Sequence, residues 1–181
     1  MSIARYLSKL GAYLGSDGKV PAAGLAAGAA RANFGAGAVL QVVQSTFNGT
    51  VSSSSSTLVD LGLSVTITPT SATSKILVSF SFPMNCGSNN AIQGEAVLLR
   101  NSTIIFDVPA IVTVSVQYPT VVCDVIAETI LDAPATISPI TYKVQIARSY
   151  YAGSYYGSVV AGNQGGTSVS ACQITAMEIA A

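Results

Sequence analysis

Few side chains in this 181-residue sequence could carry out chemistry, and most are far apart. Asp124 and Glu128 are four residues apart in an apolar segment with the composition of a β-strand. At about 3.3 Å per residue their backbones would be about 13 Å apart, whereas the two carboxyl groups of a glycosidase are separated by roughly 5 to 9.5 Å. Leaning side chains would shorten that distance, so the spacing disfavours a glycan-cleaving site without excluding it.

The other acidic residues of this region have ordinary structural explanations. Glu95 and Asp107 flank an expected turn at 101–103, and they either pair across that hairpin or lie as separate solvated residues, which we favour. Asp132 precedes a Pro-containing turn, where we expect its carboxylate to cap the turn. Calcium needs clustered carboxylates, and the acids are not clustered in this way.

The sequence contains no histidine. This removes the usual general base of Ser-His-Asp and Cys-His systems and the commonest metal ligand. Cys86, Cys123 and Cys172 are odd in number and too widely spaced for a disulfide framework or a metal site, so we expect buried free thiols. We therefore predict that the protein is not an enzyme and has no cofactor and no metal site.

Low charge is the main compositional feature. Charged residues make up 9% of the chain, against about 25% in ordinary globular proteins. The 8 basic and 8 acidic residues balance, so we expect no nucleic-acid binding. No segment offers the roughly 20 strongly apolar residues of a bilayer span, so we expect no membrane insertion. A chain with so little charge repulsion is predicted to bury surface in an oligomer.

Composition changes near residue 38. Residues 1–38 are rich in Ala and Gly and lack Thr, whereas residues 39–181 contain all the Thr. The first part has four basic residues and one acidic residue, and the second has four basic and seven acidic residues. These differences predict an N-terminal attachment segment, a short helix plus an Ala/Gly-rich linker, over residues 1–38, followed by a body over residues 39–181.

An apolar stripe marks the N-terminal segment. Its residues have the 4-3-4 spacing of a helix contact face, but such a helix is too short to persist alone in water. It needs a partner, which is its own body, sister chains or a host particle. The predicted attachment and oligomerisation residues are Ile3, Leu7, Leu10 and Leu14.

The body alternates apolar and polar residues with the period of two that is typical of β-strands. The clearest runs are 59–67, 76–82, 112–118 and 140–146, with turn-rich breaks between them. No helical pattern intervenes. We predict an all-β fold, an antiparallel, jelly-roll-like β-sandwich of about ten strands. Three further segments, at 41–44, 122–131 and 170–181, are apolar on both sides, which indicates a core face on one side and a subunit contact or a covering segment on the other.

Two segments are candidates for receptor recognition. The first is the Tyr-rich run 149–158, where Gly153 is expected to turn a hairpin, and tyrosine suits contacts with glycans or proteins. Packing in the core or at a trimer interface is the alternative explanation. The second is the amide-rich loop 85–93, which turn chemistry explains equally well. The candidate receptor contacts are Tyr150, Tyr151, Tyr155, Tyr156, Asn89 and Asn90.

Several phrases of the sequence resemble tail-fibre and receptor-binding proteins of tailed bacteriophages. They are GAVLQVVQ, LVDLGLSVTITPTSATSKILVSFSF, GEAVLLRNSTII, ETILDAPATISPITYKVQIARS and SVSACQITAMEIAA, and the stretch GSDGKVPAAGLAAGAARANFGAGAVLQ resembles the junction before such domains. The resemblance covers roughly residues 15–181 and brings no catalytic residues.

The resemblance implies a homotrimeric β-sandwich on a virion, made in the host cytoplasm. Its partners would be its own copies, other virion proteins bound through the N-terminal segment, and a glycan or protein receptor on the host surface. The chain departs from the family in having no long shaft. A head fibre or a capsid decoration (cement) protein is therefore the alternative to a short tail fibre or spike.

Overall fold

The computed structural model describes residues 35–88, 92–114, 120–151, 158–162 and 172–181. The chain divides into two units, Met1–Ala36 and Gly37–Ala181, and the strands of the described residues belong to the second unit. Those strands are β1 (Val39–Phe47), β2 (Thr50–Ser53), β3 (Val59–Ile67), β4 (Lys75–Ser88), β5 (Ile92–Arg100), β6 (Thr103–Val114), β7 (Thr120–Asp132), β8 (Ile140–Tyr151), β9 (Ser158–Gly162) and β10 (Cys172–Ile179).

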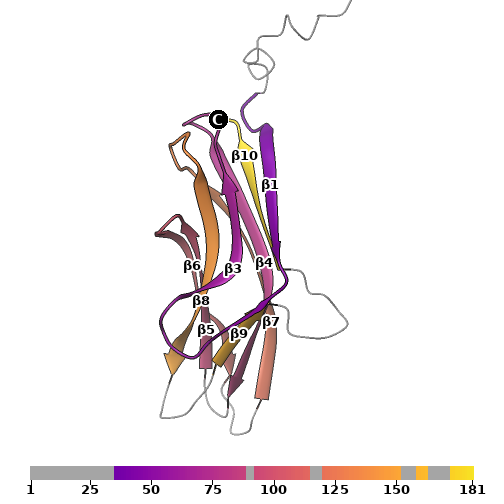
Figure 1. Cartoon of the computed structure of the whole chain (residues 1–181), viewed down its shortest axis with the longest axis vertical. Helices are drawn as coiled ribbons and strands as arrows, with labels where there is room; N and C mark the ends of the chain where they lie inside the picture. Colours follow the sequence, from indigo (N-terminus) through magenta and orange to yellow (C-terminus); the bar gives the residue numbers. More distant parts are fainter. Residues whose placement is uncertain (1–34, 89–91, 115–119, 152–157, 163–171) are drawn as a thin grey trace, which may run out of the picture. The chain divides into compact units, whose positions relative to one another are not determined.

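The strands form two antiparallel sheets that lie face to face (Figure 1). The first sheet has six strands in the order β1-β10-β4-β9-β2, with β7 paired to the other side of β4. The second sheet has four strands in the order β3-β8-β5-β6. The predicted antiparallel β-sandwich of about ten strands is confirmed, and within the described residues no segment is helical.

The core follows the alternation that the sequence showed. In β3 the inward residues are Leu61, Leu63, Val65 and Ile67; in β4 they are Ile76, Val78, Phe80 and Phe82; in β8 they are Ile140, Tyr142, Val144 and Ile146. All are buried, because successive side chains of a strand point to opposite sides and one side of each sheet faces the other sheet. The fourth run, 112–118, falls mostly outside the described residues.

β4 organises the first sheet because it is long enough to hold several partners. β10 pairs with its first half and β9 with its second half, both on the same side, while β7 pairs along its whole other side. Its 14 residues extend over about 45 Å at the usual rise per residue. The sandwich therefore has two well-separated ends.

The chain enters the body at one of these ends. The Gly37 N–H donates to the Ala180 carbonyl at 2.8 Å, so the start of the body lies beside its C-terminus. The last residues of β4 and β8 and the first residue of β5 lie at the opposite end, where Tyr151 pairs with Ile92 (Figure 1).

A glycine bulge shapes β3 where it meets β1. The pairing of β3 with β8 shifts between Asp60 and Ser64, and Gly62 within this bulge has a φ of +86°. A Cβ atom at Gly62 would lie 2.7 Å from the ring of Phe47. The site therefore requires glycine for two reasons, a left-handed backbone and the aromatic ring pressed against it.

Replacing Gly62 with Ala is expected to destabilise the body by about 1–3 kcal/mol, the usual cost of a strained backbone conformation. Urea unfolding followed by circular dichroism would measure it. Gly35→Ala is the matched control, because a Cβ there meets nothing within 4 Å. Equal midpoints for both variants would show that the bulge does not depend on glycine.

Candidate functional site

Most of the predicted recognition and attachment residues fall outside the described residues. This holds for Ile3, Leu7, Leu10 and Leu14 of the N-terminal stripe and for Asn89, Asn90, Tyr155 and Tyr156. Tyr150 and Tyr151 end β8, and their backbones pair with Gln93 and Ile92 of β5. The two candidate recognition segments, chosen separately from the sequence, thus adjoin strand ends that are direct neighbours.

Asp124 and Glu128 lie in one strand, β7, as expected, four residues apart on the same side. Ile126, buried in the core, lies between them. Asp124 is exposed, and its carboxylate accepts a hydrogen bond from the adjacent Val125 N–H at 2.7 Å.

Glu95 and Asp107 lie on the adjacent strands β5 and β6, near enough for their charges to interact. Partial burial raises the pKa of Glu95, and the negative charge of Asp107 raises it further. The two acids lie on the outer side of the second sheet, because their neighbours Ala96 and Leu98 point into the core. Glu95 and Asp107 are therefore not the separate, fully solvated residues that the sequence analysis favoured.

The expected role of Asp132 as a turn cap is wrong in one respect: its side chain binds across the sandwich. Asp132 ends β7 in the first sheet, while its partners Arg100 and Tyr142 belong to the second sheet. The Arg100 guanidinium lies 2.9 Å from the carboxylate, and the Tyr142 hydroxyl donates to it at 2.7 Å. Burial raises the pKa of Tyr142, and the hydrogen bond to the Asp132 carboxylate raises it further.

Glu178 is a buried acid that the sequence analysis missed. It lies in β10 with no exposed surface. Its carboxylate accepts hydrogen bonds from the Gln41 amide at 2.6 Å and from the Thr70 N–H and hydroxyl, each at 2.7 Å. Burial alone would raise the pKa of Glu178, but these donors outweigh it and hold the pKa below its ordinary value.

Glu178 and Asp132 lie in the same row across the first sheet. Strand pairing aligns Gln41, Glu178, Ile76 and Asp132, which we call the acid row. The row of the second sheet that faces it contains Val65, Tyr142 and Arg100. These polar contacts tie the sheets together at the end where the chain enters, so we interpret the acid row as structural.

Among the described residues, the other reactive groups do not gather into a chemical site. Cys172 is a buried free thiol, as predicted, and burial raises its pKa, which disfavours the reactive thiolate. Among the described residues, no three acidic or cysteine side chains are placed to hold a metal ion. The described part of the chain also contains no helix with the length and apolar character of a membrane span.

The outer face of the first sheet is the most unusual surface. Four apolar residues from four neighbouring strands form one row on it, which we call the apolar row: Val42, Met177, Leu77 and Leu131. The two ends of this row are the most open, since Val42 is 54% and Leu131 is 53% exposed. A continuous apolar row on a solvated sheet face is typical of an interaction surface.

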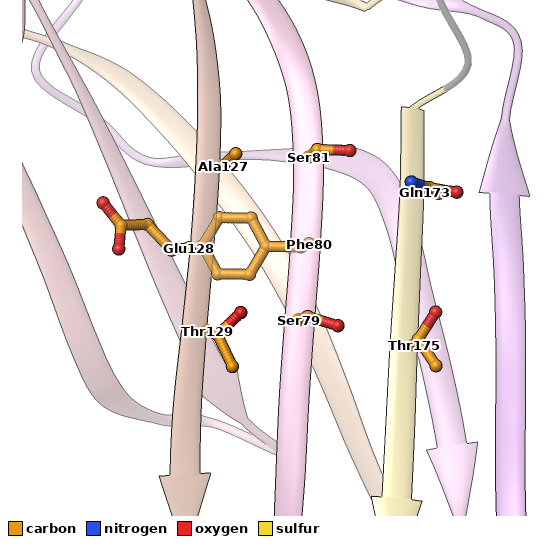
Figure 2. Close-up of a pocket in the computed structure, with 8 residues that line it drawn as sticks. All are labelled: Ser79, Phe80, Ser81, Ala127, Glu128, Thr129, Gln173 and Thr175. Atoms are coloured by element: carbon orange, nitrogen blue, oxygen red, sulfur yellow. The ribbon is translucent and has the colours of Figure 1, made fainter.

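Two rows of uncharged residues, all polar except Ala127, continue this face. The first row contains Gln44, Thr175, Ser79 and Thr129, and the second contains Thr46, Gln173, Ser81 and Ala127. A shallow groove of about 330 Å³ runs over their central strands. Figure 2 shows the hydroxyl and amide groups of β4, β7 and β10 around it, while Glu128 extends away from them.

This face has the chemistry of a binding surface. Hydroxyl and amide groups both donate and accept hydrogen bonds. The adjacent apolar row adds hydrophobic surface that a partner can bury. The three rows contain no ionisable side chain. The sequence indicated a second apolar side in these strands but did not show that the residues align across them.

A scan of protein families and a search of curated proteins each find no match to this sequence. Among solved structures, similar chains occur in infectious bursal disease virus. The Gt strain structure gives a TM-score of 0.41 at 15% identity over 78% of this chain and 38% of the viral chain. The Gx strain structure gives 0.42 at 17% over 78% and 37%, and the VP2 subviral particle gives 0.37 at 17% over 78% and 37%.

This chain therefore spans less than two fifths of the length of those viral chains.

The acid row predicts how stability changes with pH. Because the pKa of Glu178 is lowered by folding, its stabilising effect is complete above the unfolded value of about 4.5. The effect is lost as the pH falls through the lower, folded value, where the native carboxylate takes up a proton. Glu178→Gln is expected to cost about 1–3 kcal/mol at neutral pH, since charge-assisted hydrogen bonds are lost, and to flatten the acid limb of the stability curve.

Chemical denaturation between pH 3 and pH 7 would test this, with Asp60→Asn as the control. Asp60 also has a lowered pKa, from hydrogen bonds with Lys143 and Gln145, but its side chain is 58% exposed. An exposed ion pair contributes little, at most about 1 kcal/mol. If Asp60→Asn changed the curve as much as Glu178→Gln, burial of Glu178 would not be the cause.

Proposed function

We propose that this chain is a structural protein of a tailed-bacteriophage virion, a short homotrimeric tail fibre or spike without enzymatic activity. Residues 1–38 anchor it to the particle through Ile3, Leu7, Leu10 and Leu14, and the β-sandwich presents a host-attachment surface. The resemblance of its strand and turn phrases to phage receptor-binding proteins supports this proposal. The low charge and the absence of histidine agree with a protein that assembles and binds.

The observation that carries the proposal is the two-ended arrangement of the body. The chain enters beside its C-terminus, where Gly37 bonds Ala180. The strands that lead into the two candidate recognition segments end at the opposite end, where Ile92 pairs with Tyr151. An anchored fibre needs this polarity, with attachment at one end and recognition at the other.

A head fibre or capsid decoration protein is the second candidate. The three uncharged rows on the outer face of the first sheet favour it, because a cement protein binds neighbouring coat proteins over broad surfaces. Immunogold labelling of intact particles would distinguish the two, since label on the tail supports the fibre and label over the shell supports decoration. A chain absent from purified particles would overturn both.

Anchoring can be tested in the full-length chain. Replacing Leu7 and Leu10 with Ser should abolish incorporation into particles, because the stripe would lose its apolar contact, while the body stays folded. Quantitative immunoblotting of purified particles and circular dichroism of the isolated chain would measure the two effects. Replacing Ser8 and Ser16 with Ala is the control. Normal copy number in the Leu variant would place attachment elsewhere.

Recognition can be tested at the far end. Replacing Tyr151 and Tyr155 with Ser should lower the adsorption rate of particles to host cells at least tenfold, because aromatic contact with a glycan or protein would be lost. The melting temperature should stay nearly unchanged. Tyr→Phe changes at the same two positions separate ring contact from hydroxyl hydrogen bonding. A large drop in stability with normal trimer mass would instead show that the segment packs structurally.

A further inference from the structure

We propose that copies of this chain associate through the outer face of the first sheet, around a rotation axis that runs parallel to its strands. In this arrangement the apolar row of each copy becomes part of one buried layer. Only the number of copies, three, is taken from the proposed function. The surface itself is argued from the strand register.

The first argument is charge. The apolar row and the two polar rows beside it contain no ionisable side chain, and Lys75 lies one row beyond, paired with Ile179. A partner that placed a charged group on these rows would leave that charge desolvated and unpaired. A second copy brings the same uncharged rows, so it meets the face without that cost. The face is therefore complementary to itself in charge.

The second argument is register. Rotation about an axis parallel to the strands keeps each row at its own height, so the apolar row of one copy meets the apolar row of the next. The polar rows meet each other in the same way, and their hydroxyl groups can donate and accept at once. A partner shifted by one row would bury hydroxyl groups against Met177 and Leu77 without hydrogen bonds. The proposed symmetry therefore places apolar rows against apolar rows and polar rows against polar rows.

The third argument concerns the two edges of the face. Val42 is on β1 and Leu131 is on β7, at opposite ends of the apolar row. They are separated by three strand spacings, about 14 Å, so they do not meet within one copy. Rotation about the proposed axis brings the β1 edge of one copy to the β7 edge of the next. Val42 of one copy then contacts Leu131 of the next copy.

That contact gives a charge-swap test. In the full-length chain, Val42→Lys alone or Leu131→Asp alone should bury an unpaired charge and weaken association at least tenfold in sedimentation equilibrium. The double variant should regain most of the association, because the new lysine of one copy faces the new aspartate of the next. Circular dichroism checks that each variant is folded, and the milder Val42→Thr and Leu131→Ser variants serve where a charge prevents folding.

Ile104→Asp and Ile137→Asp are the matched controls, since these residues are 49% and 62% exposed, and they belong to β6 of the second sheet and to the connection between β7 and β8, not to the rows of this face. They should leave association unchanged. A chain that is monomeric alone, including one whose own N-terminal segment covers the face, overturns the proposal. So does association that neither Val42→Lys nor Leu131→Asp weakens, or that the double variant does not restore.

The outcomes keep the two proposals apart. Association through this face in a chain that is absent from particles would refute the virion function and leave the inference standing. If the chain is incorporated into particles but the two single variants associate as well as the unchanged chain, the virion function stands and the inference is refuted.

Discussion

The burial of Glu178 is the constraint on which the rest of the structure depends. An ionised carboxylate without exposed surface is tolerated only where hydrogen-bond donors surround it, and here they come from β1 and from the turn that joins the two sheets at Thr70. A slip of one residue in β10 would turn this carboxylate to the outer face and leave the donors buried without an acceptor. The acid row therefore fixes the register of β1, β10, β4 and β7.

That register also determines the outer face. Once Glu178 points inward, its neighbour Met177 must point outward, and the pairing of the other strands aligns Val42, Leu77 and Leu131 with it. The apolar row is thus a geometric consequence of the acid row beside it. The contacts of the acid row stabilise the single sandwich, and the side chains of the apolar row remain on the surface for a partner.

The sequence predicted the fold where the alternation had one interpretation. β3, β4 and β8 each have one apolar side, and the structure buries that side. β1, β7 and β10 are apolar on both sides, and their inward side depends on pairing with distant strands. Asp132 was assigned to a local turn because its partners Arg100 and Tyr142 are 32 and 10 residues away. Long-range contacts of this kind leave no periodic signal in the sequence.

The distribution of charge explains why association must rely on shape and uncharged groups. Among the few charged residues of the body, Arg100 and Asp132 bind each other, Lys143 binds Asp60, and Glu178 is buried. These five charges stabilise the folded chain, and none of the other charged residues of the body lies in the three rows of the outer face, so those rows offer no charge that could steer a partner by long-range attraction. Selectivity on the outer face then comes from the match of apolar and hydroxyl rows, which operates at contact distance and is insensitive to salt. Such a surface suits permanent assembly better than rapid exchange, because uncharged complementary faces gain affinity through slow dissociation.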